Sequence, residues 1–386
     1  MLNLKIVNLL HVFYLTGNVV SAVEFRMKKI FHRGVELKDL FRTFDVGSDL
    51  SPSEYDTFEH KVHSLKEMPW NKTISQGNRQ SYFAFQLNQN LPNVTDQQTV
   101  LNLAKMSYDA YLAPETSGWL DIGKKYSPFE SFGWKADGVR GYMFADEKNS
   151  SIVLALKGTS AGIISGDSPT SAKDKLNDNL MFSCCCARID STWHKVCDCY
   201  QKGYNCSQTC LDKKFQESSP DIYYFAAQEI LRNVQDAHPK AQLWLTGHSL
   251  GGGLSGLLGL AYNIPTVTFQ SPGDRLPASR LHLPGINALS FQDHIWHFGH
   301  NADPIFMGLC QGVSSACYIT GYALESKCHT GRVCSYDTRK VKNWGIDILK
   351  HRIGVVIAEV IETWDGVPEC VYETECVDCP LWNFVP

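Results

Sequence analysis

Apolar residues follow a helical period in one part of the chain and an extended period just after it. A helix is predicted over residues 99–111, where apolar side chains fall near helical spacing: Val100, Leu103, Ala104, Met106 and Ala110. Two apolar runs follow, at residues 138–145 and 151–156, with a polar turn between them. This second pattern predicts a β-hairpin.

Helical and extended patterns alternate from about residue 150 onward. Helices are predicted at residues 220–236, 250–262 and 345–363, and short strands at residues 242–246, 266–269 and 295–298. Residues 160–178 are rich in Gly, Ser, Asp and Lys, which favours a mobile loop there. Such alternation is typical of an α/β fold with a mostly parallel central sheet.

The first quarter of the chain has a different pattern. Residues 6–23 form the longest apolar stretch, which fits either a signal anchor in a membrane or a signal peptide cleaved after Ala22. One lysine precedes the stretch, and Arg26, Lys28 and Lys29 follow it, so the positive-inside rule would put the C-terminal side in the cytosol. Residues 24–96 are polar and predict an extension packed around the core.

The cysteines contradict that topology and favour an oxidising compartment. Composition is otherwise that of a globular protein, with 44% hydrophobic residues, and the net charge of −4 gives no basic surplus for nucleic acid. All 14 cysteines lie between Cys184 and Cys379, and an even, dense set predicts disulfides. The rival interpretation is zinc, since Cys197-Asp-Cys199 is spaced like a ligand pair. Three adjacent cysteines at 184–186 cannot all point at one ion, which favours disulfides.

Four sequons agree with an oxidising lumen. Each has the form Asn-x-Ser/Thr, and glycosylation is expected at the following residues: Asn71, Asn93, Asn149 and Asn205.

A serine nucleophile is predicted by one of two Gly-x-Ser-x-Gly motifs. A nucleophile elbow needs a strand before the serine and a helix after it, on a turn so tight that only glycine fits beside it. Ser249 meets both requirements, because an apolar strand precedes it and a run of small residues and leucines follows. Ser160 follows a strand, but the residues after it do not predict a helix.

The other motif supplies an oxyanion hole. In this type of site one donor is the backbone N–H after the nucleophile, here that of Leu250, and the other comes from an earlier strand-end loop. Residues 157–159 follow the strand at 151–156, which selects the backbone N–H of Thr159. Each such donor contributes about 3 kcal/mol to stabilising the tetrahedral oxyanion.

The acid and the base each have two candidates. Asp274 follows the strand at 266–269 and Asp303 follows the strand at 295–298; strand order favours Asp303. The base is either His329, in a loop expected to be pinned by the cysteines at 328 and 334, or His351 beside the closing helix. Spacing leaves the base open with a slight preference for His351.

Histidines recur at every third position before Asp303, in His294-x-x-His297-x-x-His300. On a strand, side chains three apart point to opposite faces, so these residues cannot gather on one ion. We expect no metal site here, and no motif calls for a cofactor.

The assembled motifs resemble the class 3 lipase group and, within it, the fungal autophagy-related vacuolar lipases, which have an α/β-hydrolase fold. The segments that carry the resemblance are residues 177–188 with the triple cysteine, 247–252, 280–284, 295–308 with His-Asn-Ala-Asp-Pro, and 329–334. The resemblance covers about residues 95–386. It implies Asp303 as the acid and His351 as the base. Some relatives carry a Ser/Thr-rich C-terminal tail that is absent here.

The resemblance also implies where the protein works. It predicts a single-pass type II membrane protein with a cytosolic tail at residues 1–5, an anchor at 6–23, a lumenal stalk at 24–96 and the lipase domain at 97–386. Such a protein would pass through the endoplasmic reticulum, Golgi and multivesicular-body membranes to the vacuole lumen. Its expected partners are phospholipids or triacylglycerol and the bilayer that holds the anchor.

The predicted reaction is ester hydrolysis. Ser249 attacks the carbonyl, His351 takes the hydroxyl proton and Asp303 fixes the imidazole. Residues 160–181 are a candidate lid over an acyl groove. Two alternatives stay open: a soluble secreted carboxylesterase, and a lumenal cysteine-rich interaction protein that has the fold without activity.

Overall fold

A central sheet organises the computed structural model, which describes residues 91–113, 116–122, 131–134, 138–147, 150–160, 170–188, 195–216, 221–286, 292–310, 320–386, a few single residues and three two-residue strands before residue 44. The strand order is β1-β5-β6-β8-β9-β10-β11-β12, and β4 also pairs with β5. The strands are β1 (Arg26–Met27), β4 (Ser131–Phe132), β5 (Gly141–Ala145), β6 (Ser151–Leu156), β8 (Gln242–His248), β9 (Thr266–Phe269), β10 (Ile295–His300), β11 (Arg332–Tyr336) and β12 (Cys370–Tyr372).

The middle of this sheet is parallel, as the alternating pattern predicts. β6, β8, β9, β10 and β11 run parallel, and β5 forms the expected antiparallel hairpin with β6. The carboxyl ends of the five parallel strands therefore meet at one edge, which is where ligands and catalytic groups gather in open α/β sheets.

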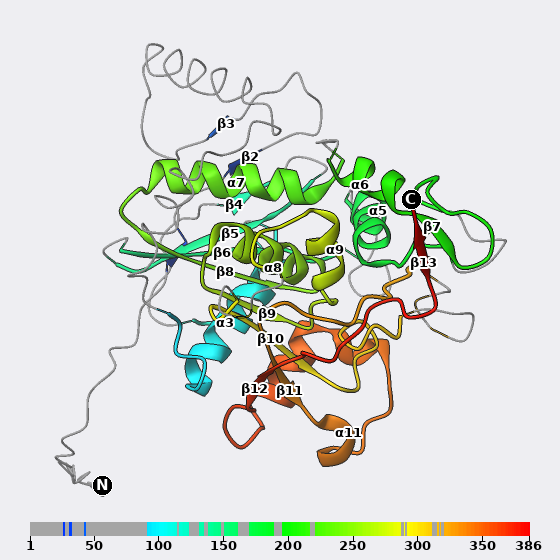
Figure 1. Ribbon diagram of the computed structural model, residues 1–386. Coiled ribbons are helices and arrows are strands. Elements are labelled where there is room, and N and C mark those ends of the chain that lie inside the picture. Colours follow the sequence, from blue (N-terminus) through cyan, green and yellow to red (C-terminus); the bar gives the residue numbers. More distant parts are fainter. Residues whose placement is uncertain are drawn as a thin grey trace, which may run out of the picture.

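Helices cover both faces of the sheet (Figure 1). α7 (Tyr223–Ala237) and α8 (Leu250–Tyr262) pack on one face, and α3 (Gln97–Asp109) packs on the other. β6 shows why both faces are apolar: Leu154 contributes to the first hydrophobic cluster, and its neighbour Val153 to the second. The helices predicted at 99–111, 220–236 and 250–262 are confirmed.

The loop predicted at 160–178 is wrong from residue 171 onward, because α5 (Ser171–Phe182) begins there. The helix escapes hydrophobic patterning since its buried face is polar, with Asp174, Asn177 and Asp178 all inside the protein. Residues 161–169, the other part of the candidate lid, lie outside the described residues.

The single helix predicted at 345–363 is also wrong. The chain forms a 3₁₀ turn, η2 (Ile348–His351), a short helix, α12 (Ile353–Val355), and a π-helical turn, η3 (Val356–Ile361). Arg352 separates the first two with extended backbone angles (φ −60°, ψ 127°). His351 therefore lies at the end of a 3₁₀ turn, where the chain can aim its side chain at the sheet edge.

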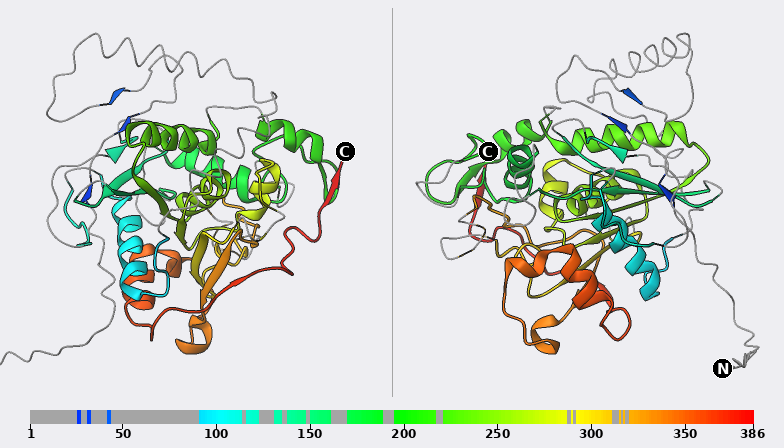
Figure 2. Two further views of the ribbon diagram at one scale, coloured as in Figure 1. Left: turned by 60° about the vertical axis from the view of Figure 1, so that its left-hand side comes forward. Right: turned by 180° about the vertical axis from the view of Figure 1, so that it is seen from behind.

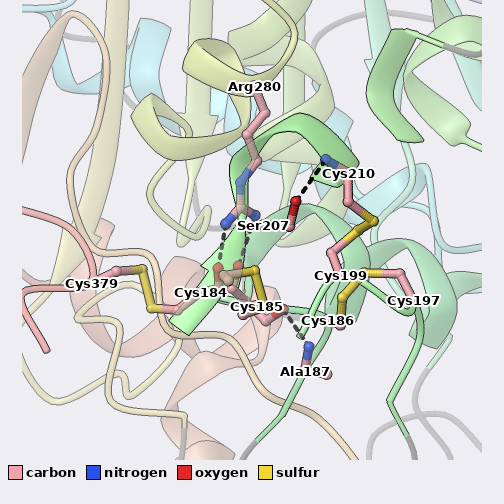
Figure 3. Close-up of a disulfide and its surroundings, with 12 residues drawn as sticks. Cys184, Cys185, Cys186, Ala187, Cys197, Cys199, Ser207, Cys210, Arg280 and Cys379 are labelled. Atoms are coloured by element: carbon pink, nitrogen blue, oxygen red, sulfur yellow. Dashed lines mark hydrogen bonds between the residues drawn. A yellow bond between two sulfur atoms is a disulfide. The ribbon is translucent and has the colours of Figure 1, made fainter. Parts of the chain in front are cut away.

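Disulfides join all 14 cysteines, which confirms the interpretation of the cysteine pattern over zinc. The pairs are Cys184–Cys379, Cys185–Cys206, Cys186–Cys197, Cys199–Cys210, Cys310–Cys317, Cys328–Cys376 and Cys334–Cys370. The triple cysteine diverges to three partners, and Arg280 donates to the carbonyls of Ser183 and Cys184 beneath it (Figure 3). The loop around His329 is pinned by bonds to the C-terminal segment, not by a bond between Cys328 and Cys334.

The C-terminal segment, residues 370–379, thus runs across the molecule and is disulfide-bonded to the triple cysteine and to the region of Cys328 and Cys334 (Figure 2). β13 (Asn383–Val385) then pairs with β7 (Asn205–Ser207), beside α6 (Gln208–Gln216). Three further elements complete the described ranges: α9 (Arg275–Arg280), α11 (Thr338–Val341) and the small hairpin of β2 (Phe31–His32) and β3 (Arg42–Thr43).

No helix within the described ranges is both long and apolar enough to cross a bilayer. The anchor predicted at residues 6–23 lies outside those ranges, as does most of the stalk at 24–96.

An ion pair ties the C-terminal segment to the sheet. His329 is buried, and its Nδ1 lies 3.3 Å from the Glu373 carboxylate. Burial alone would lower the pKa of His329, but the hydrogen bond and charge of Glu373, with the charge of Asp274, raise it. In the same way, His329 holds the pKa of Glu373 below its usual value despite burial.

We predict that Glu373→Gln lowers the melting temperature mainly in mildly acidic solution. The raised pKa of His329 stabilises the fold below about pH 6.5, and this stabilisation is lost as the pH rises through the folded-state pKa. The depressed pKa of Glu373 stabilises the fold above about pH 4.5, and this stabilisation is lost as the pH falls. A charged hydrogen bond stabilises the folded state by about 1 kcal/mol more than a neutral one, which corresponds to a shift of roughly 3 °C in melting temperature. Thermal unfolding at pH 5.5 and pH 8 measures this, and an equal loss at both would contradict the ion pair.

Candidate active site

Ser249 lies at the carboxyl end of β8, on the turn into α8. Its backbone angles are φ 57° and ψ −129°, a conformation that non-glycine residues rarely adopt. A Cβ on Gly247 would come 2.5 Å from the backbone of Gly251, and a Cβ on Gly251 would come 2.2 Å from the carbonyl oxygen of Leu156, so both positions need glycine for the turn to close. The turn therefore has the strand–serine–helix form of a nucleophile elbow.

Three side chains meet at this turn. Nε2 of His351 lies 2.9 Å from Oγ of Ser249, and Nδ1 of His351 lies 2.7 Å from Oδ2 of Asp303. All three residues are buried, and Asp303 also accepts a hydrogen bond from the N–H of Ile305. The structure therefore brings together the serine, the histidine and the acid that the sequence and the resemblance selected.

The rival acid and base lie in a different cluster. Asp274 accepts hydrogen bonds from the backbone N–H and the hydroxyl of Thr330, and its Oδ2 lies 3.6 Å from His297. His329 contacts the Ser271 carbonyl and Glu373. The two groups are linked through His297, whose ring contacts that of His329, and neither Asp274 nor His329 makes a hydrogen bond to Ser249 in the described structure.

The two oxyanion donors proposed from the sequence flank Ser249. Leu250 is the first residue of α8, where backbone N–H groups have no partner within the helix. Gly158 packs so closely that a Cβ there would lie 3.1 Å from the Cβ of Ser249, which puts the following residue, Thr159, beside the serine. Both residues are buried at the carboxyl edge of the sheet.

Buried carboxylates of α5 fix the loop that carries Thr159. Asp178 accepts a hydrogen bond of 2.5 Å from the Thr159 hydroxyl, and Asp174 accepts one of 2.8 Å from the N–H of Ser160. Burial is the main cause that raises the pKa of Asp178, to about 8, and it lowers the pKa of Lys157 to about 8. The Ser160 hydroxyl is bonded to Lys157, so the second motif serine helps to hold the loop.

Sequence reasoning missed a contact between the elbow and the base. Nε2 of His248 lies 2.8 Å from the backbone carbonyl of His351, and its Nδ1 lies 2.7 Å from the hydroxyl of Tyr111. Burial, with the nearby His351, holds the pKa of His248 well below its usual value. A neutral imidazole that accepts from Tyr111 donates through Nε2 to the carbonyl, so His248 positions the chain at the base. The only signal for it in the sequence is its place next to Ser249.

The remaining sequence-predicted residues are dispersed. His294 bonds to the carbonyl of Gly259, His297 contacts Thr268, and His300 bonds to the carbonyl of Lys350, so the three histidines do not converge. Among the sequons, Asn93 is exposed and accepts from Thr95, and Asn205 is half-buried in β7. Asn71 and Asn149 lie outside the described residues.

We predict that Tyr111→Phe lowers kcat about tenfold with little change in melting temperature. Losing the hydroxyl frees the tautomer of His248 and loosens the His351 backbone, and small misplacements of a catalytic group are costly. Kinetics on a soluble ester measure the effect. The matched control is Tyr224→Phe, since the buried Tyr224 hydroxyl has no hydrogen-bond partner among the described residues. Equal losses in the two variants would contradict the positioning role.

Comparison with solved structures gives distant matches. Lip2 lipase from Yarrowia lipolytica has 17% identity and a TM-score of 0.34, and the match covers 61% of this chain and 78% of that one. A mutant form of MDLA from Penicillium cyclopium has 18% identity and a TM-score of 0.30, with 74% and 81% covered.

Sequence comparison gives a closer match. Residues 181–268 match the family described as "Lipase (class 3)". A Saccharomyces cerevisiae (strain YJM789) protein named "Putative lipase ATG15" is 48% identical over 301 residues, covering 76% of this chain and 58% of its own length. The protein of the same name from Pichia angusta is 46% identical, with 76% and 55% covered. The chain thus spans a little over half the length of the curated relatives it matches. It belongs to the class 3 lipase family.

Proposed function

We propose that this protein is a serine lipase or phospholipase that hydrolyses ester bonds of membrane lipids. The observation that carries the proposal is the hydrogen-bonded series from Ser249 through His351 to Asp303 on a strained elbow. His351 takes the proton of the Ser249 hydroxyl as the oxygen attacks the ester carbonyl, and Asp303 stabilises the imidazolium. The N–H groups of Thr159 and Leu250 receive the oxyanion.

Deacylation uses the same groups. His351 gives its proton to the leaving alcohol, the acyl group remains on Ser249, and His351 then activates a water molecule that releases the fatty acid. Asp303 is already held by the N–H of Ile305, so it orients the imidazole without rearrangement.

The substrates and the compartment follow from family and chemistry. The relatives are named as lipases of the autophagy series, which supports lipids of autophagic bodies and multivesicular-body vesicles as substrates in a vacuole lumen. Seven disulfides support a lumenal, oxidising location for the body. A type II anchor at residues 6–23 would deliver it there through the endoplasmic reticulum and Golgi.

We predict that Ser249→Ala lowers fatty-acid release from phospholipid vesicles about 10⁴-fold or more. The control is Ser160→Ala, which removes the serine of the other Gly-x-Ser-x-Gly motif and should retain activity within about tenfold. Release is measured with both vesicles and a short soluble ester. Equal rates for Ser249→Ala and the parent would refute the nucleophile, and turnover of the soluble ester alone would identify a carboxylesterase.

A further inference from the structure

The segment from the end of β11 to Arg352, residues 337–352, combines exposed apolar and basic side chains. Val341 is 65% exposed, Ile346 47% and Leu349 45%. Five basic side chains accompany them: Arg339, Lys340, Lys342, Lys350 and Arg352. Apolar side chains of this size that remain exposed together mark interaction surfaces.

This segment lies at the sheet edge that carries the active site. Asp347 donates its N–H to the carbonyl of Ala302, and Lys350 accepts from His300, so the segment is fastened to the loop of Asp303. His351 is itself the next-to-last residue of the segment. α11, at its start, projects from one end of the molecule in every view (Figures 1 and 2).

Its charge is opposite to that of the whole chain. Against the five basic residues stand Asp337 and Asp347, which leaves a surplus of three positive charges on a chain of net −4. Both aspartates cap backbone N–H groups at helix starts. Nearby, Glu359 pairs with Lys350 at 3.3 Å, which reduces the local surplus without reversing it.

A half-buried tryptophan links the charges to the apolar side chains. Nζ of Lys350 lies 4.1 Å from the centre of the Trp344 ring, and Nζ of Lys342 lies 5.9 Å from it. The Trp344 ring also makes a T-shaped contact with the ring of His300. Aromatic, aliphatic and basic side chains side by side are the composition that inserts at the headgroup level of an anionic bilayer.

The last 18 residues, 369–386, provide the contrast. They expose apolar side chains as well, with Val377 at 60% and Leu381 at 72%. Residues 369–386 contain four acidic residues and no lysine or arginine, so this surface would be repelled by anionic headgroups.

We propose that residues 337–352 form a docking surface for an anionic lipid bilayer and hold the active-site edge against the membrane. The inference rests on the proposed lipid hydrolysis for its purpose, because an interfacial enzyme must keep its site at the lipid surface between turnovers. In this proposal Arg339 and Lys340 attract the anionic lipid headgroups. Val341 inserts at the boundary between the headgroups and the acyl chains.

Binding is tested with the full chain carrying Ser249→Ala, so that lipid is not consumed. Its apparent affinity is measured for phosphatidylserine-containing vesicles and for pure phosphatidylcholine vesicles, at low and high salt. The ratio of the affinity for anionic vesicles to the affinity for phosphatidylcholine vesicles cancels any contribution that residues 6–23 make to binding of both vesicle types. We expect at least a fivefold preference for the anionic vesicles, removed by R339E with K340E and by high salt. Val341→Ser should weaken binding to both vesicle types.

Controls separate docking from catalysis. Lys202→Glu and Val377→Ser change charge and apolar exposure elsewhere and should leave the preference intact. With Ser249 present, R339E with K340E should keep the soluble-ester rate of the parent, which shows that the site is folded. A preference that survives R339E with K340E, or that is absent in the parent, overturns the docking proposal. Failure of the proposed function would instead appear as ester turnover that persists in Ser249→Ala.

Discussion

The architecture of the site depends on one backbone constraint, the positive φ of Ser249. A non-glycine residue in such a conformation costs about 1–3 kcal/mol, so the surroundings must hold it there. Glycines on both sides allow β8 and α8 to approach, and the N–H of Ser249 is bonded to the carbonyl of Phe269 on the neighbouring strand. The turn places the Ser249 hydroxyl 2.9 Å from Nε2 of His351 and is followed directly by Leu250, whose N–H we propose as an oxyanion donor. In this arrangement the parallel sheet holds the turn in place, and the turn carries the serine that we propose as the nucleophile.

Hydrogen bonds from buried polar side chains hold the surrounding loops in place beside that turn. Asp174 and Asp178 hold the loop of Thr159 from α5, and His248 holds the backbone of His351. Each of these groups is buried, so an unmade hydrogen bond would be costly and the geometry is well determined. The disulfides act at longer range: Cys184–Cys379 and Cys328–Cys376 fasten the C-terminal segment to the triple cysteine and to the loop before β11.

The sequence predicts the strands of the central sheet from β5 to β10 and the elbow well because they have strong local signals, but it misses β12 and also β11, part of which it predicts as a loop. β8, β9 and β10 read as short apolar strands, and the small residues after Ser249 predict α8 with its observed bounds. α5 and the segment around His351 are mispredicted for opposite reasons. α5 buries Asp174, Asn177 and Asp178, which read as loop residues, and the region after residue 345 has a helical period but breaks at Arg352. The hydrogen bond between His248 and the His351 carbonyl joins residues 103 positions apart, and no local pattern contains it.

The central claim is that Ser249, alone among the serines that the structure describes, has an activated hydroxyl. A long-chain alkyl phosphonate reacts covalently with such a hydroxyl, and mass spectrometry of the digested protein locates the adduct. The account predicts modification of the peptide that contains Ser249, and its loss in His351→Ala. An adduct on Ser160, or on Ser249 with equal yield in His351→Ala, would contradict it.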